Sequence, residues 1–234
     1  MLAAVRPGLR LLTLLAALAV ALAAAACGGD DDSDGAATAT ATAPAARACE
    51  PAEPPVPRGE PRLRPPRRRL DPAKTWTATV TTNCGAFTIT LDARRAPRTT
   101  ASFAALARRG FYDGLSFHRI APGFVIQGGD PLGNGQGGPG YTVEEPPPDD
   151  LAYTRGVVAM AKTATDPDGT SGSQFFIVTA EDAQLPPQYA LLGRVTEGLD
   201  VVDLIGQLPL KSNDPQGDEP VDPVVIERVE IGER

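Results

Sequence analysis

The chain has 234 residues, with 22 basic and 29 acidic side chains and a formal net charge of −7. The acidic excess lies in residues 74–234, which hold 13 Lys and Arg against 21 Asp and Glu. A domain with this charge is a poor binder of nucleic acid, because neutralising phosphates requires basic side chains. Its single His and single Cys also cannot close a structural zinc site, so we expect no nucleic-acid partner and no metal.

Residues 1–26 have the pattern of a secretory signal. Arg6 and Arg10 precede an uncharged apolar run, and small residues lead to Cys27. The run is too short and too rich in Ala for a membrane span. The segment resembles a bacterial lipobox, although Ala24 stands where leucine is usual. That resemblance implies acylation of Cys27, as with palmitate, and attachment to the extracytoplasmic face of the cell membrane; the alternative is an ordinary cleaved signal with a chance cysteine.

Residues 27–73 follow as a predicted disordered tether. They are rich in Ala, Thr, Pro and charge, and contain few large apolar side chains that could offset the entropy of ordering. The Pro content favours an extended spacer. In an exported protein the two remaining cysteines, Cys49 and Cys84, can form a disulfide. Two free thiols, with Cys84 partly buried, are the alternative.

Residues 74–234 are long enough for one domain with its own core. Apolar and polar residues alternate over 75–82 and 87–91, with Asn83-Cys84-Gly85 between them, which predicts a β-hairpin. A helix is expected over 96–109, with Pro97 near its start and Gly110 as its stop.

Further along the domain, short apolar runs alternate with loops rich in Gly and Pro. The runs are 115–120, 124–127, 157–162, 175–178 and 190–195. Residues 197–208 suggest a second helix, and 224–231 read as a closing strand. Many short strands with two helices predict a mostly β domain, a closed β-barrel with helical covers.

Several motifs follow one another in a specific order and spacing. They are Phe117-His118-Arg119, Pro122-Gly123-Phe124, Gln127-Gly128-Gly129-Asp130, Gly172-Ser173-Gln174-Phe175-Phe176 and Leu192-Gly193-Arg194-Val195. Together they resemble the cyclophilin family of peptidyl-prolyl cis–trans isomerases over about residues 74–234. The family fold is an eight-stranded antiparallel barrel capped by two helices. The resemblance implies catalysis at X–Pro bonds of unfolded or partly folded exported proteins, without a cofactor, by a protein expected to be monomeric.

The resemblance also assigns roles to single residues. Arg119 matches the arginine that donates toward the prolyl nitrogen. The positions matching substrate-binding residues are Phe124, Val125, Gln127, Gly135, Ala161, Lys162, Gln174, Phe176, Leu185 and Tyr189. Three of them depart from common family residues: Val125 replaces methionine, Lys162 asparagine and Tyr189 histidine.

Three other functions are open from the residues alone. A non-catalytic peptide-binding chaperone on the same fold would be favoured by loss of Arg119, which is present. A barrel that carries small apolar ligands fits the polar Arg119 and Gln127 poorly. A general-base role for His118 lacks a positioned nucleophile, so His118 is expected to be structural.

Overall fold

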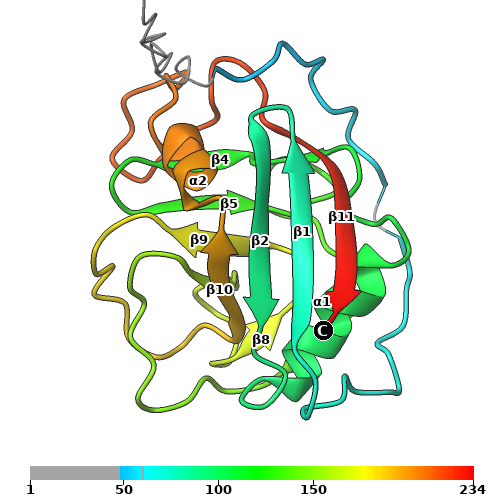
Figure 1. The fold of residues 1–234 in the computed structure, drawn as a ribbon. Helices are drawn as coiled ribbons and strands as arrows, with labels where there is room; N and C mark the ends of the chain where they lie inside the picture. Colours follow the sequence, from blue (N-terminus) through cyan, green and yellow to red (C-terminus); the bar gives the residue numbers. More distant parts are fainter. Residues whose placement is uncertain (1–47, 60) are drawn as a thin grey trace, which may run out of the picture. The chain divides into compact units, whose positions relative to one another are not determined.

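The structure, a computed structural model, describes residues 48–59 and 61–234. Its strands are β1 (Trp76–Thr82), β2 (Gly85–Leu91), β3 (Leu115–Ser116), β4 (Arg119–Ala121), β5 (Val125–Gly128), β6 (Val143–Glu144), β7 (Val157–Met160), β8 (Thr170–Ser171), β9 (Phe175–Val178), β10 (Leu191–Glu197) and β11 (Val225–Glu233). Its helices are α1 (Pro97–Ala107) and α2 (Leu199–Gly206). Figure 1 shows β2, β1 and β11 side by side, as their pairing requires.

The predicted hairpin is confirmed. β1 and β2 pair antiparallel from Trp76 opposite Leu91 to Thr82 opposite Gly85, so the chain reverses through Asn83 and Cys84. Gly85 has a φ of +122°, a backbone conformation that side chains rarely adopt, which explains why the turn ends in glycine.

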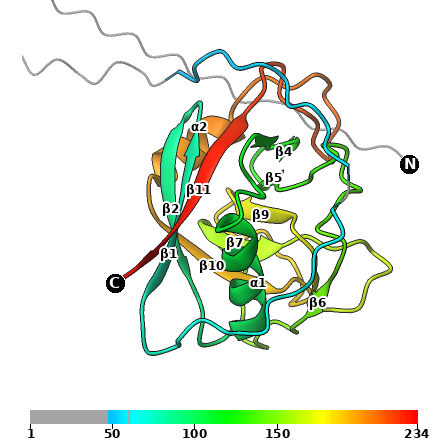
Figure 2. The ribbon, with the colours of Figure 1, turned by 90° about the vertical axis from the view of Figure 1, so that its right-hand side faces the viewer.

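The sheet is open and has nine strands, so the prediction of a closed eight-stranded barrel is not met. The strand order is β3-β11-β1-β2-β10-β7-β9-β5-β4, and β6 pairs with β8 separately. The sheet curls strongly, as Figure 2 shows. Its edge strands β3 and β4 pair with β11 and β5, and not with each other. Only Phe117 and His118 separate β3 from β4 in the sequence. The chain therefore passes directly from one edge strand to the other, although no strand pairing joins these two edges.

Both predicted helices are present, slightly shorter than expected. Helix α1 begins with Pro97, which has no N–H to leave unpaired. The Glu145 carboxylate accepts hydrogen bonds from the backbone N–H groups of Arg98 (2.9 Å) and Thr99 (2.8 Å), which are the free donors of the first turn. A residue distant in sequence therefore caps the helix and complements its dipole.

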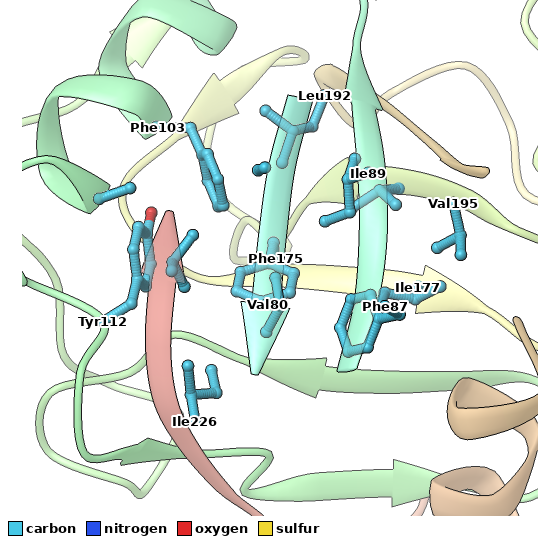
Figure 3. Packing of buried hydrophobic residues seen from close by; sticks show 14 of the residues in the cluster. Val80, Phe87, Ile89, Phe103, Tyr112, Phe175, Ile177, Leu192, Val195 and Ile226 are labelled. Carbon is cyan, nitrogen blue, oxygen red and sulfur yellow. The ribbon is translucent and has the colours of Figure 1, made fainter. Parts of the chain in front are cut away.

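The central strands are apolar on both faces because both are covered. Ile126 and Ile177 belong to the main core, whereas Val125, Phe176 and Val178 belong to a second apolar cluster. Successive residues of a strand point to opposite faces, so the two clusters lie on the two sides of the sheet. Figure 3 shows aromatic and aliphatic side chains of the main core meeting between α1 and the sheet.

The N-terminal part of the described chain differs from the predicted tether. The described residues 48–59 and 61–73 contain no helix or strand, yet they lie along the outside of the domain (blue to cyan in Figures 1 and 2). Cys49 forms a disulfide with Cys84, and Leu70 is 6% exposed. The described residues 48–59 and 61–73, which were predicted to be part of a disordered tether, are therefore held against the domain at these two points.

The predicted signal and Cys27 lie outside the described residues. Within the described residues, no helix is long and apolar enough to cross a membrane.

Candidate active site

Three neighbouring strands bring the predicted polar residues together. In the sheet register, Arg119 of β4 lies opposite Gln127 of β5, and Gln127 lies opposite Phe176 of β9. Residues opposite one another on antiparallel strands point to the same face, so these side chains form a row across the sheet. The row lies on the face of the second apolar cluster, to which Phe176 belongs.

A chain of side-chain hydrogen bonds joins this row to a glycine-rich loop. Arg119 donates from Nη1 to Gln127 Oε1 at 3.0 Å, and Gln127 Nε2 donates to Gln174 Oε1 at 3.0 Å. Gln174 Nε2 in turn donates to the carbonyls of Gly135 (3.0 Å) and Gly137 (2.9 Å). Each amide is thus held in one orientation by a partner at both ends.

Arg119 keeps donors free for a ligand. Its Nε and Nη2 both donate to the carbonyl of Gln216, with 2.8 Å for the Nε contact. A guanidinium carries five N–H groups, so the bonds to Gln127 and Gln216 leave one N–H on each terminal nitrogen. Burial lowers the pKa of Arg119 from its ordinary value, but an arginine stays charged near neutral pH.

Gln216 has no counterpart in the sequence prediction. It lies on the loop between α2 and β11, and an isolated bridge between Ile120 and Asp218 brings this loop beside β4. It contributes only its backbone carbonyl. Backbone atoms leave no signature of residue type, so no sequence signal identifies this contact.

An apolar surface adjoins the row. Phe176 (5% exposed) and Val125 (2% exposed) are buried in the second cluster. The partly buried predicted residues that pack against it are Phe124, Ala161, Leu185 and Tyr189. The Phe176 and Tyr189 rings meet edge to face with centroids 5.3 Å apart, a favourable aromatic geometry.

The Tyr153 hydroxyl fixes the backbone of Tyr189 by hydrogen bonds. The Tyr153 hydroxyl donates to the Tyr189 carbonyl (2.7 Å) and accepts from the Tyr189 N–H (3.0 Å). Burial raises the pKa of Tyr153 to about 12, so the phenol stays protonated and keeps its donor. The aromatic wall formed by the rings of Phe176 and Tyr189 is therefore fixed by two hydrogen bonds to the Tyr189 backbone as well as by packing.

A groove of about 700 Å³ lies on the other side of the polar row. Five predicted site residues line it: Gln127, Gly135, Ala161, Lys162 and Gln174. The structure thus places every predicted substrate-binding residue either at this groove or in the apolar cluster.

The Lys162 side chain folds back into its own loop. Its side chain is only 6% exposed, and Nζ donates to the carbonyl of Asp166 at 3.1 Å. The ammonium also lies 3.8 Å from an Asp168 carboxylate oxygen and 5.7 Å from the centre of the Tyr189 ring. Lys162 therefore connects the groove loop to the aromatic wall, a role that its backbone position alone does not suggest.

The described residues contain no cluster of three or more His, Cys, Asp or Glu side chains able to hold a metal ion. His118, next to Arg119 in sequence, is buried, and neither ring nitrogen has a hydrogen-bond partner.

The site offers a guanidinium, two oriented amides, an apolar surface and a groove. This equipment can hold a peptide in a fixed orientation.

Comparison with known proteins agrees with this geometry. The family model "Cyclophilin type peptidyl-prolyl cis-trans isomerase/CLD" matches residues 77–231. Peptidyl-prolyl cis-trans isomerase-like 1 of Mus musculus is 40% identical over 162 residues, which cover 66% of this chain and 93% of the relative. Peptidyl-prolyl cis-trans isomerase A of Mycobacterium tuberculosis is 38% identical over 178 residues, covering 68% and 94%.

A solved structure has the same fold. It is a Cryptosporidium parvum cyclophilin-type isomerase crystallised in the presence of the dipeptide Ala-Pro, with a TM-score of 0.61 and 31% identity. The match covers 68% of this chain and 99% of that one. The chain therefore belongs to the cyclophilin-type peptidyl-prolyl cis–trans isomerase family. Its reaction is rotation about the peptide bond that precedes proline.

Proposed function

We propose that Arg119 is the catalytic residue of this isomerase. The barrier to peptide rotation is about 18–20 kcal/mol and comes from amide resonance. As the bond twists, the prolyl nitrogen regains its lone pair and becomes a hydrogen-bond acceptor. The two N–H groups that Arg119 keeps free can donate to it, and stabilisation confined to the twisted state raises the rate.

The substrate is a proline-containing peptide segment. The proline ring packs on the apolar surface formed by Phe124, Phe176 and Leu185, and Gln127 holds the peptide backbone. The neighbouring chain of the substrate runs along the groove at Ala161. The Ala-Pro dipeptide used with the Cryptosporidium parvum relative supports a site of this size.

The observation that carries the assignment is the fixed guanidinium with two unused donors. Its test is an X–Pro isomerisation assay on the purified full-length protein and on Arg119→Ala. Removing one transition-state donor typically lowers the rate about 10²–10³-fold, and we expect a loss of that order. Arg119→Lys keeps the charge but lacks the planar fork, so it should recover only part of the rate.

The assay also separates the alternative function. A folded Arg119→Ala protein with an unchanged rate would contradict the catalytic assignment. A wild-type protein that binds unfolded chains without accelerating isomerisation would favour a non-catalytic chaperone.

The setting that we propose is the extracytoplasmic face of the cell membrane. Cys27 would carry the acyl anchor, and the monomeric domain would assist the folding of exported proteins. Two observations support this location: the basic and then apolar pattern of residues 1–26, and the Cys49–Cys84 disulfide. Disulfides persist in oxidising compartments and are rare in the cytosol.

A further inference from the structure

Residues 48–59 and 61–73, which we call the strap, are fixed to the domain near both ends. At the first end, Cys49 is bonded to Cys84 in the turn between β1 and β2. Beside it, the Glu50 N–H donates to the Asn83 carbonyl, and Asn83 Nδ2 donates back to the Glu50 carbonyl, each at 2.7 Å. At the other end, Leu70 is buried in the main core.

The middle of the strap contacts residues 130–140, the glycine loop, near each of its ends. The Arg58 N–H donates to the Pro131 carbonyl at 2.8 Å, and the Leu63 N–H donates to the Pro139 carbonyl at 3.0 Å. Between them, a Cβ added at Gly140 would lie only 2.3 Å from the Pro61 carbonyl oxygen. The two backbones are therefore in direct contact, and Gly140 permits their approach.

The glycine loop is also part of the substrate site. The carbonyls of Gly135 and Gly137 accept the two hydrogen bonds that orient Gln174, and both glycines line the groove. Asp130 holds the start of the loop, because its carboxylate accepts from the N–H groups of Leu132 and Asn134 at 2.8 and 3.0 Å. A loop rich in glycine has many accessible backbone conformations, so its shape depends on such contacts.

We propose that the strap positions the glycine loop for substrate binding, with Leu63 as a positioning residue and the Cys49–Cys84 disulfide as the fastening. The loop is held by Gln174 on the substrate side and by the strap at Pro131 and Pro139. Loosening the strap leaves the contacts of Arg119 with Gln127 and Gln216 in place. The expected effect on activity rests on the proposed function. Loosening the strap should weaken substrate binding more than it slows the isomerisation step.

The experiment compares Cys49→Ser and Leu63→Ala with wild type as full-length proteins. Leu63→Ala keeps the backbone N–H but removes the side chain that packs against the main core and holds this part of the strap in place. Val56→Ala is the matched control, because Val56 lies in the same strap and is 81% exposed. The readouts are KM and kcat for a tetrapeptide with one X–Pro bond, and hydrogen exchange at the Gly135 N–H. We expect both test variants to raise KM about fivefold, with kcat within about twofold of wild type. Exchange at Gly135 should become about tenfold faster, while the control should change neither quantity.

A reductant gives an independent arm. Dithiothreitol reduces the disulfide by thiol exchange and is itself oxidised to a cyclic disulfide. It should reproduce the Cys49→Ser changes in wild type and have no effect on Cys49→Ser.

The outcomes separate the two proposals. If an active wild type and both test variants share the same KM and exchange rate, the strap does not position the loop and the inference is wrong. If wild type shows no isomerase activity, the proposed function fails, and Gly135 exchange alone decides the inference. Faster exchange in both variants supports it, and unchanged exchange overturns it.

Discussion

At the scale of single residues, Gln174 connects two parts of the site. Its side-chain amide accepts a hydrogen bond from Gln127 and donates hydrogen bonds to the carbonyls of Gly135 and Gly137. It therefore links the row that contains Gln127 to the loop that lines the groove. Gln174→Leu has a similar volume and removes every one of these bonds. Each is worth about 1 kcal/mol net, and we expect kcat/KM to fall roughly tenfold or more.

The control for this variant is Gln188→Leu, at an exposed position immediately before Tyr189 in the sequence. The measurement is kcat/KM for an X–Pro peptide, with circular dichroism to verify folding. Equal activities of the two variants would show that the amide chain does not orient the site.

His118 predicts a pH dependence of stability. Burial lowers its pKa below the ordinary value of 6.5, and the charge of Arg119 acts in the same direction, whereas the charges of Asp130 and Glu219 oppose the shift. Below about pH 6.5 the unfolded chain therefore binds a proton that the folded protein takes up only at lower pH. The free energy of unfolding should decrease as pH falls through this range.

The measurement is urea unfolding of wild type and His118→Gln at pH 7.5 and 5. Carboxyl groups such as those of Asp166 and Asp218, whose pKa values are lowered by hydrogen bonds, titrate in both proteins, so their effect cancels in the difference. The stability advantage of wild type over the variant should shrink at pH 5. A difference that is constant with pH would contradict the assignment.

The sequence could predict a site residue when its side chain has a recognisable place in a motif, but not when it contributes a backbone atom or a contact that depends on loop folding. Side chains such as Arg119 and Gln127 stand in a specific order and spacing, so the motifs identified them before the structure. Gln216 acts through its carbonyl, and the contacts of the Lys162 ammonium depend on how its loop folds. Neither is encoded in a pattern of residue types.

At the scale of elements, the disulfide is the tie between the strap and the sheet. Cys49 and Cys84 are 35 residues apart, and a loop of this length is typically stabilised by about 2–4 kcal/mol when it is closed. Cys49→Ser should lower the free energy of unfolding by that amount. Denaturant unfolding with and without reductant measures it, and reductant should not affect the variant.

Thiol counting tests the same bond directly. Mature protein with an acylated Cys27 should show no reactive thiol in denaturant before reduction and two afterwards. Two thiols before reduction would refute the bridge.

The strap shows why composition misjudged residues 48–73. Few large apolar residues occur there, and the prediction assumed that order requires apolar burial. The segment is instead ordered by a disulfide, by backbone hydrogen bonds at Arg58 and Leu63, and by one buried leucine, Leu70. Backbone bonds and a covalent link leave almost no trace in hydrophobicity.

In the rest of the fold, the length of an element decided whether the sequence pattern could predict it. The seven-residue strands β1 and β2 alternate clearly, and their hairpin was predictable. β6 and β8 have two residues each, too few for any period to appear. The run 115–120 looked like one strand, but it holds β3 and the start of β4, which lie at opposite ends of the strand order of the sheet.

At the scale of the whole molecule, the docked strap brings the domain closer to its proposed anchor. A tether over 27–73 would allow a long maximum distance between Cys27 and the domain, but Cys49 is already bonded to the domain through Cys84. A fully extended chain spans at most about 3.3–3.6 Å per residue, so the segment between these cysteines reaches no more than roughly 80 Å. We therefore expect clients that are close to the membrane surface.

The anchor itself is the last prediction. Small residues precede Cys27 and a polar, acidic run follows it, so the cysteine should be the acylated N-terminus of the mature protein. Cells supplied with labelled palmitate should label wild type and Cys49→Ser but not Cys27→Ser, because only Cys27 provides the acceptor. Cys49→Ser controls for a general effect of losing a cysteine. Since the site is built from residues beyond the strap, the unlabelled variant should keep wild-type kcat/KM. Wild type that carries no label and remains wholly in the secreted soluble fraction would show that residues 1–26 are an ordinary cleaved signal.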